Sequence, residues 1–218
     1  MPAAVLIVAS TRVHKDAQEI LRIQDTVSAL FSEGYAVDLL VPRLSPLLSA
    51  ALDPAARIFT VPNFPLCGNP PPRASIRRFL TAILMALRGI ALTARNDYTV
   101  LHGVNDGSII ARAIGNLTIT AMPCIAEFHS PFAENRHRHG LRTAIARALE
   151  NRTFRRAAAV VLPDSDVLDC FNRKLSRARV SLIPDPHAEI SPDAFTVGEF
   201  NSAIAHVYEY VLRPRFEN

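Results

Sequence analysis

His129 is the residue of this sequence whose position best suits chemistry. It directly follows the largely apolar segment Cys124–Phe128 and precedes Ser130. An imidazole at the end of a buried strand could act as a general base or donate a hydrogen bond to a sugar or a phosphate. The alternative is a structural histidine bonded to the backbone, which the residues alone favour two to one.

Further polar residues could line the same cleft, among them Ser130 directly after His129, His102 at the end of its apolar run, and residues that follow two other apolar runs. Those after Val5–Ala9 are Ser10, Thr11, Arg12, Lys15 and Asp16, and those after Thr99–His102 include Asn105 and Asp106. Cations at the N-terminus of a following helix could meet a phosphate there, whereas Asp16 serves equally well as a helix N-cap. His102 and Asp106 could form an acid/base pair, but the Asn105-Asp106-Gly107 turn is favoured as ordinary turn and capping chemistry.

Arginines gather in two stretches, although the formal net charge is only +4. Residues 73–95 hold five arginines and no acid, and residues 136–156 hold seven arginines and one acid. In the second stretch Arg136, Arg138, Arg142 and Arg147 are candidates for contact with an anionic surface, such as lipid headgroups or phosphates. A solvated helix face explains these arginines equally well.

Several classes of function lack their motifs. No G-x-G-x-x-G follows the first apolar run, which removes most support for a dinucleotide-dependent oxidoreductase, the weakest alternative. The histidines of the second basic stretch lie among cations, and the three cysteines form no C-x-x-C, so we expect no metal and no cofactor. Few aromatic residues accompany the arginines, so we expect no nucleic-acid partner. The reduced cysteines and the absence of a signal peptide predict a cytoplasmic location.

Short apolar runs alternate with longer helical patterns, and this alternation predicts an α/β fold. We expect a single Rossmann-like, doubly wound, mostly parallel sheet of about seven strands with a C-terminal crossover helix. The predicted strands are Val5–Ala9, Ala36–Val41, Arg57–Val61, Thr99–His102, Cys124–Phe128, Ala159–Leu162 and Val180–Ile183. In such a sheet, ligands bind beyond the carboxyl ends of the strands, where the candidate residues lie.

Helices are predicted between these strands, and one more follows them. Their ranges are Asp16–Ser32, Ser75–Thr93, Ser108–Ile114, Leu141–Arg156, Asp166–Leu175 and Ala194–Leu212. Phe79–Ala94 is interrupted by Arg88 and falls short of the roughly 20 residues that cross a bilayer, so it should be a buried or interfacial helix. The proline-rich segment Pro62–Pro72 should form an exposed loop. We divide the chain into a domain of residues 1–187 and a linker with a C-terminal helix at residues 188–218.

Five segments, read in order, resemble the N-terminal domain of family-4-like glycosyltransferases of the GT-B fold. They are the first βαβ unit from Val5 to Leu40, the strand Asp97–Gly103, the strand Met122–His129, the segment Glu150–Ser165, and Val180–Pro186. The resemblance implies that His129 is the acceptor-side histidine of the active site and that residues 10–16 line the cleft between two domains. Only about thirty residues follow Pro186, so most of a second, donor-binding domain is expected to be missing.

The resemblance therefore implies a domain that binds a glycan or lipid-linked acceptor. It would take part in sugar transfer from a nucleotide sugar only with a separate donor-domain polypeptide. Family members commonly act at membranes, so the domain is expected at the inner membrane face as a peripheral protein. The alternative is a non-catalytic interaction or scaffold module derived from such an enzyme.

Overall fold

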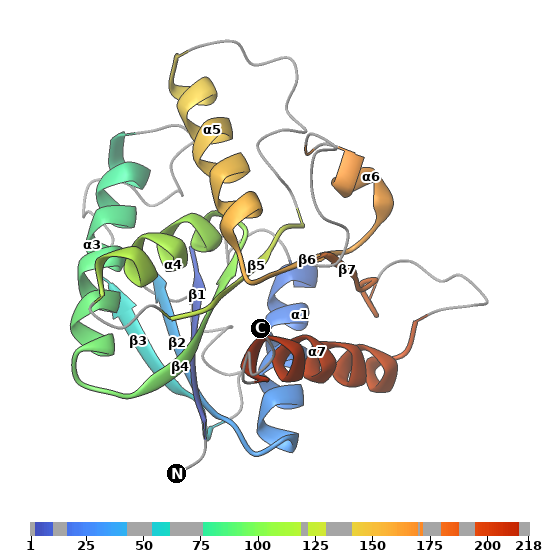
Figure 1. Ribbon diagram of the computed structural model, residues 1–218. Helices are drawn as coiled ribbons and strands as arrows, with labels where there is room; N and C mark the ends of the chain where they lie inside the picture. The colour runs from blue at the N-terminus through green and yellow to red at the C-terminus, as the bar shows by residue number, and fades with distance from the viewer. Residues whose placement is uncertain are drawn as a thin grey trace.

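The computed structural model describes residues 3–10, 17–42, 54–61, 76–118, 122–129, 141–169, 171, 180–187 and 195–213. They form one sheet of seven strands in the order β3-β2-β1-β4-β5-β6-β7 (Figure 1). Every neighbouring pair of strands runs parallel. The strands are β1 (Ala4–Ala9), β2 (Ala36–Pro42), β3 (Arg57–Val61), β4 (Tyr98–Val104), β5 (Cys124–Glu127), β6 (Ala159–Leu162) and β7 (Val180–Leu182).

The seven predicted strands are therefore confirmed, with shifts of one or two residues at some ends. The apolar runs mark the inner strands because helices cover both faces of a parallel sheet and bury successive side chains, whereas the edge strands β3 and β7 are mostly not buried. In β1, residues Val5–Ala9 are fully buried. Gly34, at a φ of 80°, ends the first helix and lets the chain turn into β2.

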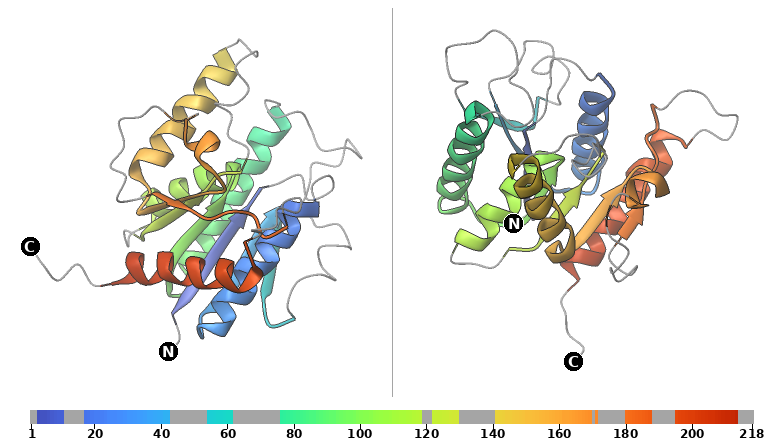
Figure 2. Two further views of the ribbon diagram at one scale, coloured as in Figure 1. Left: turned by 90° about the vertical axis from the view of Figure 1, so that its right-hand side faces the viewer. Right: turned by 90° about the horizontal axis from the view of Figure 1, so that it is seen from above.

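The helices are α1 (Ala17–Ser32), α3 (Ile76–Thr93), α4 (Asp106–Leu117), α5 (Leu141–Arg156), α6 (Ser165–Asp169) and α7 (Val197–Leu212). Helices α1 and α7 lie side by side on one face of the sheet, and α3, α4 and α5 cover the other face (Figures 1 and 2). The predicted helices are confirmed with small shifts at their ends, and α6 is described as far as Asp169, since residues 172–179 lie outside the described part. The predicted loop Pro62–Pro72 lies outside the described residues.

Three apolar core clusters fill the space between the sheet and its helices, and the third lies around Phe128, Phe154 and Phe171. Ile7 and Ile125 face α1 and α7, where Ile23 and Phe200 pack against them. Leu6, on the opposite side of β1, belongs to the core beneath α3 and α4. The two faces alternate residue by residue along each strand. His102 pairs with both Ile7 and Ile125 in the sheet, so its side chain lies on the face covered by α1 and α7.

Helix α7 brings the end of the chain back onto the domain. Thr196 caps its N-terminus, and Thr196 and Glu199 form a reciprocal capping box. Phe200, Ile204 and Tyr208 are fully buried against the α1 side of the core. The predicted crossover helix is thus present, whereas the division at residue 187 stays a prediction because residues 188–194 lie outside the described part.

Candidate functional site

Three of the candidate residues that can be placed lie at the carboxyl ends of three adjacent strands. Ser10 follows β1, Asn105 follows β4, and His129 lies two residues beyond the end of β5. The strand order reverses between β1 and β4, and open α/β sheets bind ligands at this point. The Oγ of Ser10 is buried and has no hydrogen-bond partner among the residues that the structure describes.

A tight turn after β4 presents Asn105 to the end of β5. A Cβ on Gly107 would lie 2.0 Å from the carbonyl oxygen of Val8, so the turn can approach β1 only with glycine there. Asn105 has a φ of 51° and a ψ of −121°, a strained backbone conformation outside the left-handed helical region. Its backbone N–H donates to the Glu127 carbonyl at 2.7 Å, and its Oδ1 accepts from the His129 N–H at 2.7 Å. The backbone on both sides of Phe128 is therefore held by Asn105.

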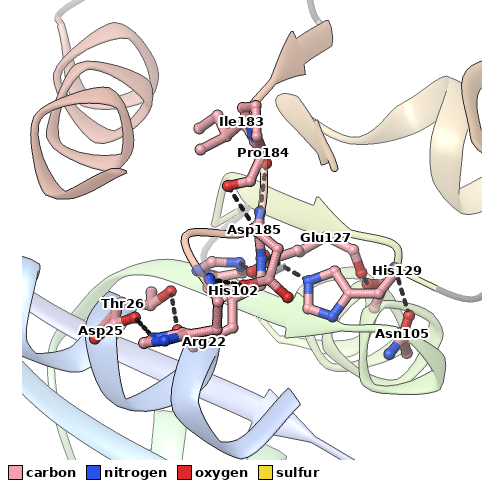
Figure 3. Close-up of polar contacts among 12 residues, drawn as sticks. Arg22, Asp25, Thr26, His102, Asn105, Glu127, His129, Ile183, Pro184 and Asp185 are labelled. Atoms are coloured by element: carbon pink, nitrogen blue, oxygen red, sulfur yellow. Dashed lines mark hydrogen bonds and ion pairs between the residues drawn. The ribbon is translucent and has the colours of Figure 1, made fainter. Parts of the chain in front are cut away.

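A buried carboxylate, Glu127, lies at the centre of the site (Figure 3). Its Oε1 accepts hydrogen bonds from Arg22 Nε at 2.6 Å and from His129 Nε2 at 2.7 Å. Its Oε2 lies 3.1 Å from His102 Nε2, a close electrostatic contact that lacks the angle of a hydrogen bond. The alternation along β5 explains the grouping, since Glu127 and His129 point to the same side as Ile125.

Glu127 is ionised in this environment. Burial opposes the charged form, but the guanidinium of Arg22 and the hydrogen bond from His129 outweigh burial and hold the pKa of the Glu127 carboxyl well below its usual range. Only 1% of the Glu127 side chain is exposed, compared with 15% for His129. His129 is thus the member of the pair that can meet a ligand.

Arg22 ties this carboxylate to the segment that follows β7. Its Nη2 donates to the Ile183 carbonyl at 2.9 Å and its Nη1 donates to the Pro184 carbonyl at 3.0 Å. The guanidinium also lies over the ring of Phe200 from α7, at 4.8 Å from the ring centroid. The guanidinium of Arg22 therefore joins α1, β5, α7 and the segment after β7.

His187 adds a second contact between the segment after β7 and α1. Its Nε2 lies 2.7 Å from Asp25 Oδ2, and its backbone N–H donates to Asp185 Oδ1 at 2.9 Å. These contacts fix the course of the chain where it leaves the sheet.

His102 does not form the predicted alternative pair with Asp106. Its ring is fully buried, and its Nδ1 lies 2.7 Å from the hydroxyl of Tyr208 on α7. The turn explanation holds in part: the Ser108 N–H donates to the Asn105 carbonyl at 2.9 Å and Asp106 begins α4, but the Asn105 side chain makes no capping hydrogen bond. His102 therefore lies between Glu127 and Tyr208 in the interior of the domain, where a ligand cannot contact it.

The remaining predicted residues divide by whether the structure describes them. Arg147 is half-buried on α5, and Arg142 lies in the first turn of that helix, where its side chain is outside the described part. Thr11, Arg12, Lys15, Asp16, Ser130, Arg136 and Arg138 lie outside the described residues. Their roles in the cleft or at an anionic surface stay predictions.

Sequence reasoning missed Arg22, Glu127 and Tyr208. A charged residue inside a buried strand needs a charged or hydrogen-bonding partner, so Glu127 within Cys124–Phe128 was a usable signal. Arg22 carried a similar signal, because it is flanked by apolar residues on the buried side of α1. Nothing local in the sequence pairs the two, since 105 positions separate them.

Two kinds of feature are not found in the described part of the chain. No group of three or more histidine, cysteine or acidic residues is placed to hold a metal ion there. Among the same residues, no helix is long and apolar enough to span a membrane.

The family model of Glycosyltransferase Family 4 matches residues 22–186, which is more than half of the 218-residue chain. No curated relative matches the chain in sequence. The match includes Arg22, Asn105, Glu127 and His129, whereas Ser10 lies before the matched residues.

Solved structures show the same fold at low sequence identity. A piece of sucrose-phosphate synthase from Thermosynechococcus elongatus is similar at a TM-score of 0.61 and 16% identity, with 96% of this chain and 97% of that piece covered. A longer chain of that enzyme is similar at a TM-score of 0.60 and 17% identity, with 84% of this chain and 48% of that chain covered. The Phytolacca americana protein UGT2, solved with UDP-2-fluoro-glucose and pterostilbene, gives a TM-score of 0.57 and 11% identity over 84% of this chain and 54% of its own.

The chain thus spans about half the length of these longer relatives. A UDP-GlcNAc 2-epimerase from Methanocaldococcus jannaschii shares the fold at a TM-score of 0.57 and 10% identity, with 94% of this chain and 50% of that chain covered. The fold alone therefore does not distinguish sugar transfer from epimerisation, and the family model decides the assignment. By that match, the chain belongs to Glycosyltransferase Family 4 and forms a Rossmann-like domain of the GT-B type.

Proposed function

We propose that this domain binds the acceptor in sugar transfer and that His129 contacts the acceptor hydroxyl. The observation that carries the proposal is the partly accessible ring of His129, held at the end of β5 by the buried carboxylate of Glu127. Asn105 fixes the backbone beneath the ring, and Ser10 adds a hydroxyl at the neighbouring strand end. The acceptor would be a glycan or a lipid-linked sugar.

Transfer also needs a nucleotide sugar, and we propose that a separate donor domain binds it. In the reaction, the acceptor oxygen forms a bond to the anomeric carbon, and the bond between that carbon and the nucleotide phosphate breaks. The electron pair leaves with the phosphate, and the hydroxyl proton passes to the imidazole of His129. Support comes from the longer relatives, of which this chain covers about half, and from the UDP-sugar bound to one of them.

Binding measurements on the 218-residue chain test whether it binds the acceptor but not the nucleotide sugar. Isothermal titration would compare UDP-glucose and UDP with a panel of oligosaccharides and alkyl glycosides. We expect binding of a glycan or glycolipid probe that His129→Ala weakens about tenfold, as for the loss of one good hydrogen bond. His206→Ala is the matched control, because His206 lies on α7 with 75% of its side chain exposed.

Other outcomes point elsewhere. Tight binding of UDP-glucose by the chain alone would contradict the proposed need for a donor domain. No binding of any probe would favour the alternative of a non-catalytic interaction module. Because the chain belongs to Glycosyltransferase Family 4, the earlier alternative of an oxidoreductase is no longer needed.

We also propose that α3 attaches the domain to the inner, cytoplasmic face of an anionic membrane. Phe79, Ile83 and Leu87 recur every four residues on α3 with exposed fractions of 66%, 40% and 59%. Exposed Arg88 lies beside this stripe, with its guanidinium 5.9 Å from the ring centroid of Phe59. An apolar stripe flanked by cations suits a membrane interface.

Flotation with lipid vesicles tests the attachment. We expect the chain to float with vesicles that contain phosphatidylglycerol and less with pure phosphatidylcholine vesicles. The variant Phe79→Ser/Leu87→Ser should lose flotation, whereas Leu117→Ser is the control because Leu117 is 68% exposed on a different helix. Equal flotation of both variants would contradict the proposal. A soluble oligomer formed through the same stripe would indicate a protein partner instead.

A further inference from the structure

The two oxygens of Glu127 face three side chains that can carry positive charge. Arg22 and His129 share Oε1 at 2.6 and 2.7 Å, and His102 lies 3.1 Å from Oε2. Neutralising the charge of Glu127 needs only Arg22, which already forms a buried ion pair with it. The contact with His129 is therefore additional, and its geometry constrains the imidazole.

An ionised carboxylate can only accept hydrogen bonds. The contact between His129 Nε2 and Glu127 Oε1 therefore requires a proton on Nε2. A neutral imidazole has one protonated and one unprotonated nitrogen, so Nδ1 then carries the lone pair. Among the described residues, no hydrogen-bond partner is found for Nδ1 of His129.

The backbone around His129 is fixed as firmly as the ring. Asn105 accepts from the His129 N–H and donates to the Glu127 carbonyl, each at 2.7 Å. The Phe128 N–H donates to the Val161 carbonyl at 3.1 Å, which ties the same stretch to β6. The imidazole is thus held at its backbone and at Nε2, with Nδ1 left for a ligand.

We propose that Glu127 is a positioning residue that holds neutral His129 in the tautomer with the proton on Nε2, so that Nδ1 accepts a hydrogen bond from an acceptor hydroxyl. The inference rests on the proposed function and specifies which atom of the site receives the acceptor. The positioning role also gives a reason for the buried carboxylate of Glu127. If the pair with Arg22 only stabilised the fold, apolar residues could take its place without loss of stability.

His102 also contacts Glu127, but unlike His129 it is fully buried and therefore cannot contact a ligand. Its Nδ1 already has a partner, the Tyr208 hydroxyl. Burial and the charge of Glu127 raise the pKa of Tyr208 well above its usual range. The hydroxyl therefore keeps its proton and can donate a hydrogen bond to Nδ1 of His102. Glu127 thus contacts one fully buried histidine and one partly accessible histidine.

Nuclear magnetic resonance can read the tautomer directly in the full 218-residue chain. Histidine would be labelled with nitrogen-15, and long-range correlation spectra would be recorded where the neutral rings dominate. The loss of one set of signals in His129→Ala assigns its ring among the seven histidines. We expect a protonated Nε2 and an unprotonated Nδ1 for His129 in the wild-type chain.

The variant Glu127→Gln separates positioning from packing. A glutamine side chain can donate or accept, so it no longer requires the proton on Nε2, and we expect the two tautomers of His129 to mix. Glu209→Gln is the matched control, since Glu209 lies 3.5 Å from exposed His206 and should leave the His129 signals unchanged. Dispersion of the backbone amide signals checks that each variant is folded.

Two results would overturn the inference. One is a proton on Nδ1 of wild-type His129, a readout that needs no variant and holds even if Glu127→Gln fails to fold. The other is a folded Glu127→Gln chain whose His129 tautomer is unchanged. The spectra require no acceptor, so a fixed tautomer together with no glycan binding would reject the proposed function but not the positioning role.

Discussion

Nε of Arg22 lies 2.6 Å from Oε1 of Glu127, and the two side chains are 2% and 1% exposed. Neither charge is hydrated, so each depends on the other and on the surrounding hydrogen bonds. Arg22 makes two further bonds to carbonyl oxygens, which satisfy much of its guanidinium. Losing one partner of such a pair costs more than losing both, because a single buried charge remains.

The first prediction concerns this asymmetry. Arg22→Met should lower the free energy of unfolding by about 3–5 kcal/mol, the usual cost of breaking a buried ion pair. The double variant Arg22→Met/Glu127→Met should be more stable than Arg22→Met alone, because no uncompensated charge is buried. Urea unfolding at pH 7 measures both. Additive losses in the double variant would show that the two charges do not depend on each other.

The second prediction is the response of this pair to acid. The pKa of Glu127 is held well below its usual range in the folded chain, whereas the unfolded carboxyl titrates near about 4.3. Below the unfolded value, the unfolded chain binds a proton that the folded chain does not bind. The stability from Glu127 is therefore fully present above about pH 5 and falls as the pH drops toward the folded value.

Urea unfolding at a series of pH values from neutral to acid would show this loss. We expect the wild-type chain to lose stability relative to Arg22→Met/Glu127→Met as the solution becomes more acidic. A constant difference over the whole series would mean that the pKa of Glu127 is the same in the folded and unfolded chain.

The elements of the fold could be predicted from the sequence because their signals are local. Each strand is a short apolar run, and a parallel sheet buries both faces of such a run. The site was predicted only in part: Asn105 directly follows β4 and His129 lies two residues beyond β5, so their position near the strand ends was visible in the sequence. Glu127 and Arg22 meet only after β5 and α1 pack together, which no local pattern specifies.

The third prediction concerns the contact between Tyr208 and His102. Tyr208→Phe removes the hydroxyl and leaves Nδ1 of His102 buried without its partner, at a cost of about 1–3 kcal/mol. Tyr210→Phe should change stability little, because Tyr210 is 56% exposed. Thermal unfolding followed by circular dichroism compares the two variants. Equal melting temperatures for both would argue against a hydrogen bond at His102.

The fourth prediction uses two glycines whose substitution should act in opposite directions. Gly107→Ala would place a Cβ 2.0 Å from the Val8 carbonyl oxygen, so the turn must move away from β1. We expect a loss of about 1–3 kcal/mol, as for other overpacked sites. The His129 N–H signal should also shift, since this N–H donates to Asn105 in the same turn.

Gly198→Ala is the matched comparison for Gly107→Ala. A Cβ at Gly198 meets only Thr196 Oγ1, at 3.9 Å, and alanine is favoured over glycine within a helix by about 0.5–1 kcal/mol. Gly198→Ala should therefore stabilise α7 and leave the His129 signal in place. Urea unfolding and amide spectra of both variants give the result. A tolerated Gly107→Ala would show that the turn does not need its close approach to β1, and the positioning of Asn105 beneath His129 would then need another cause.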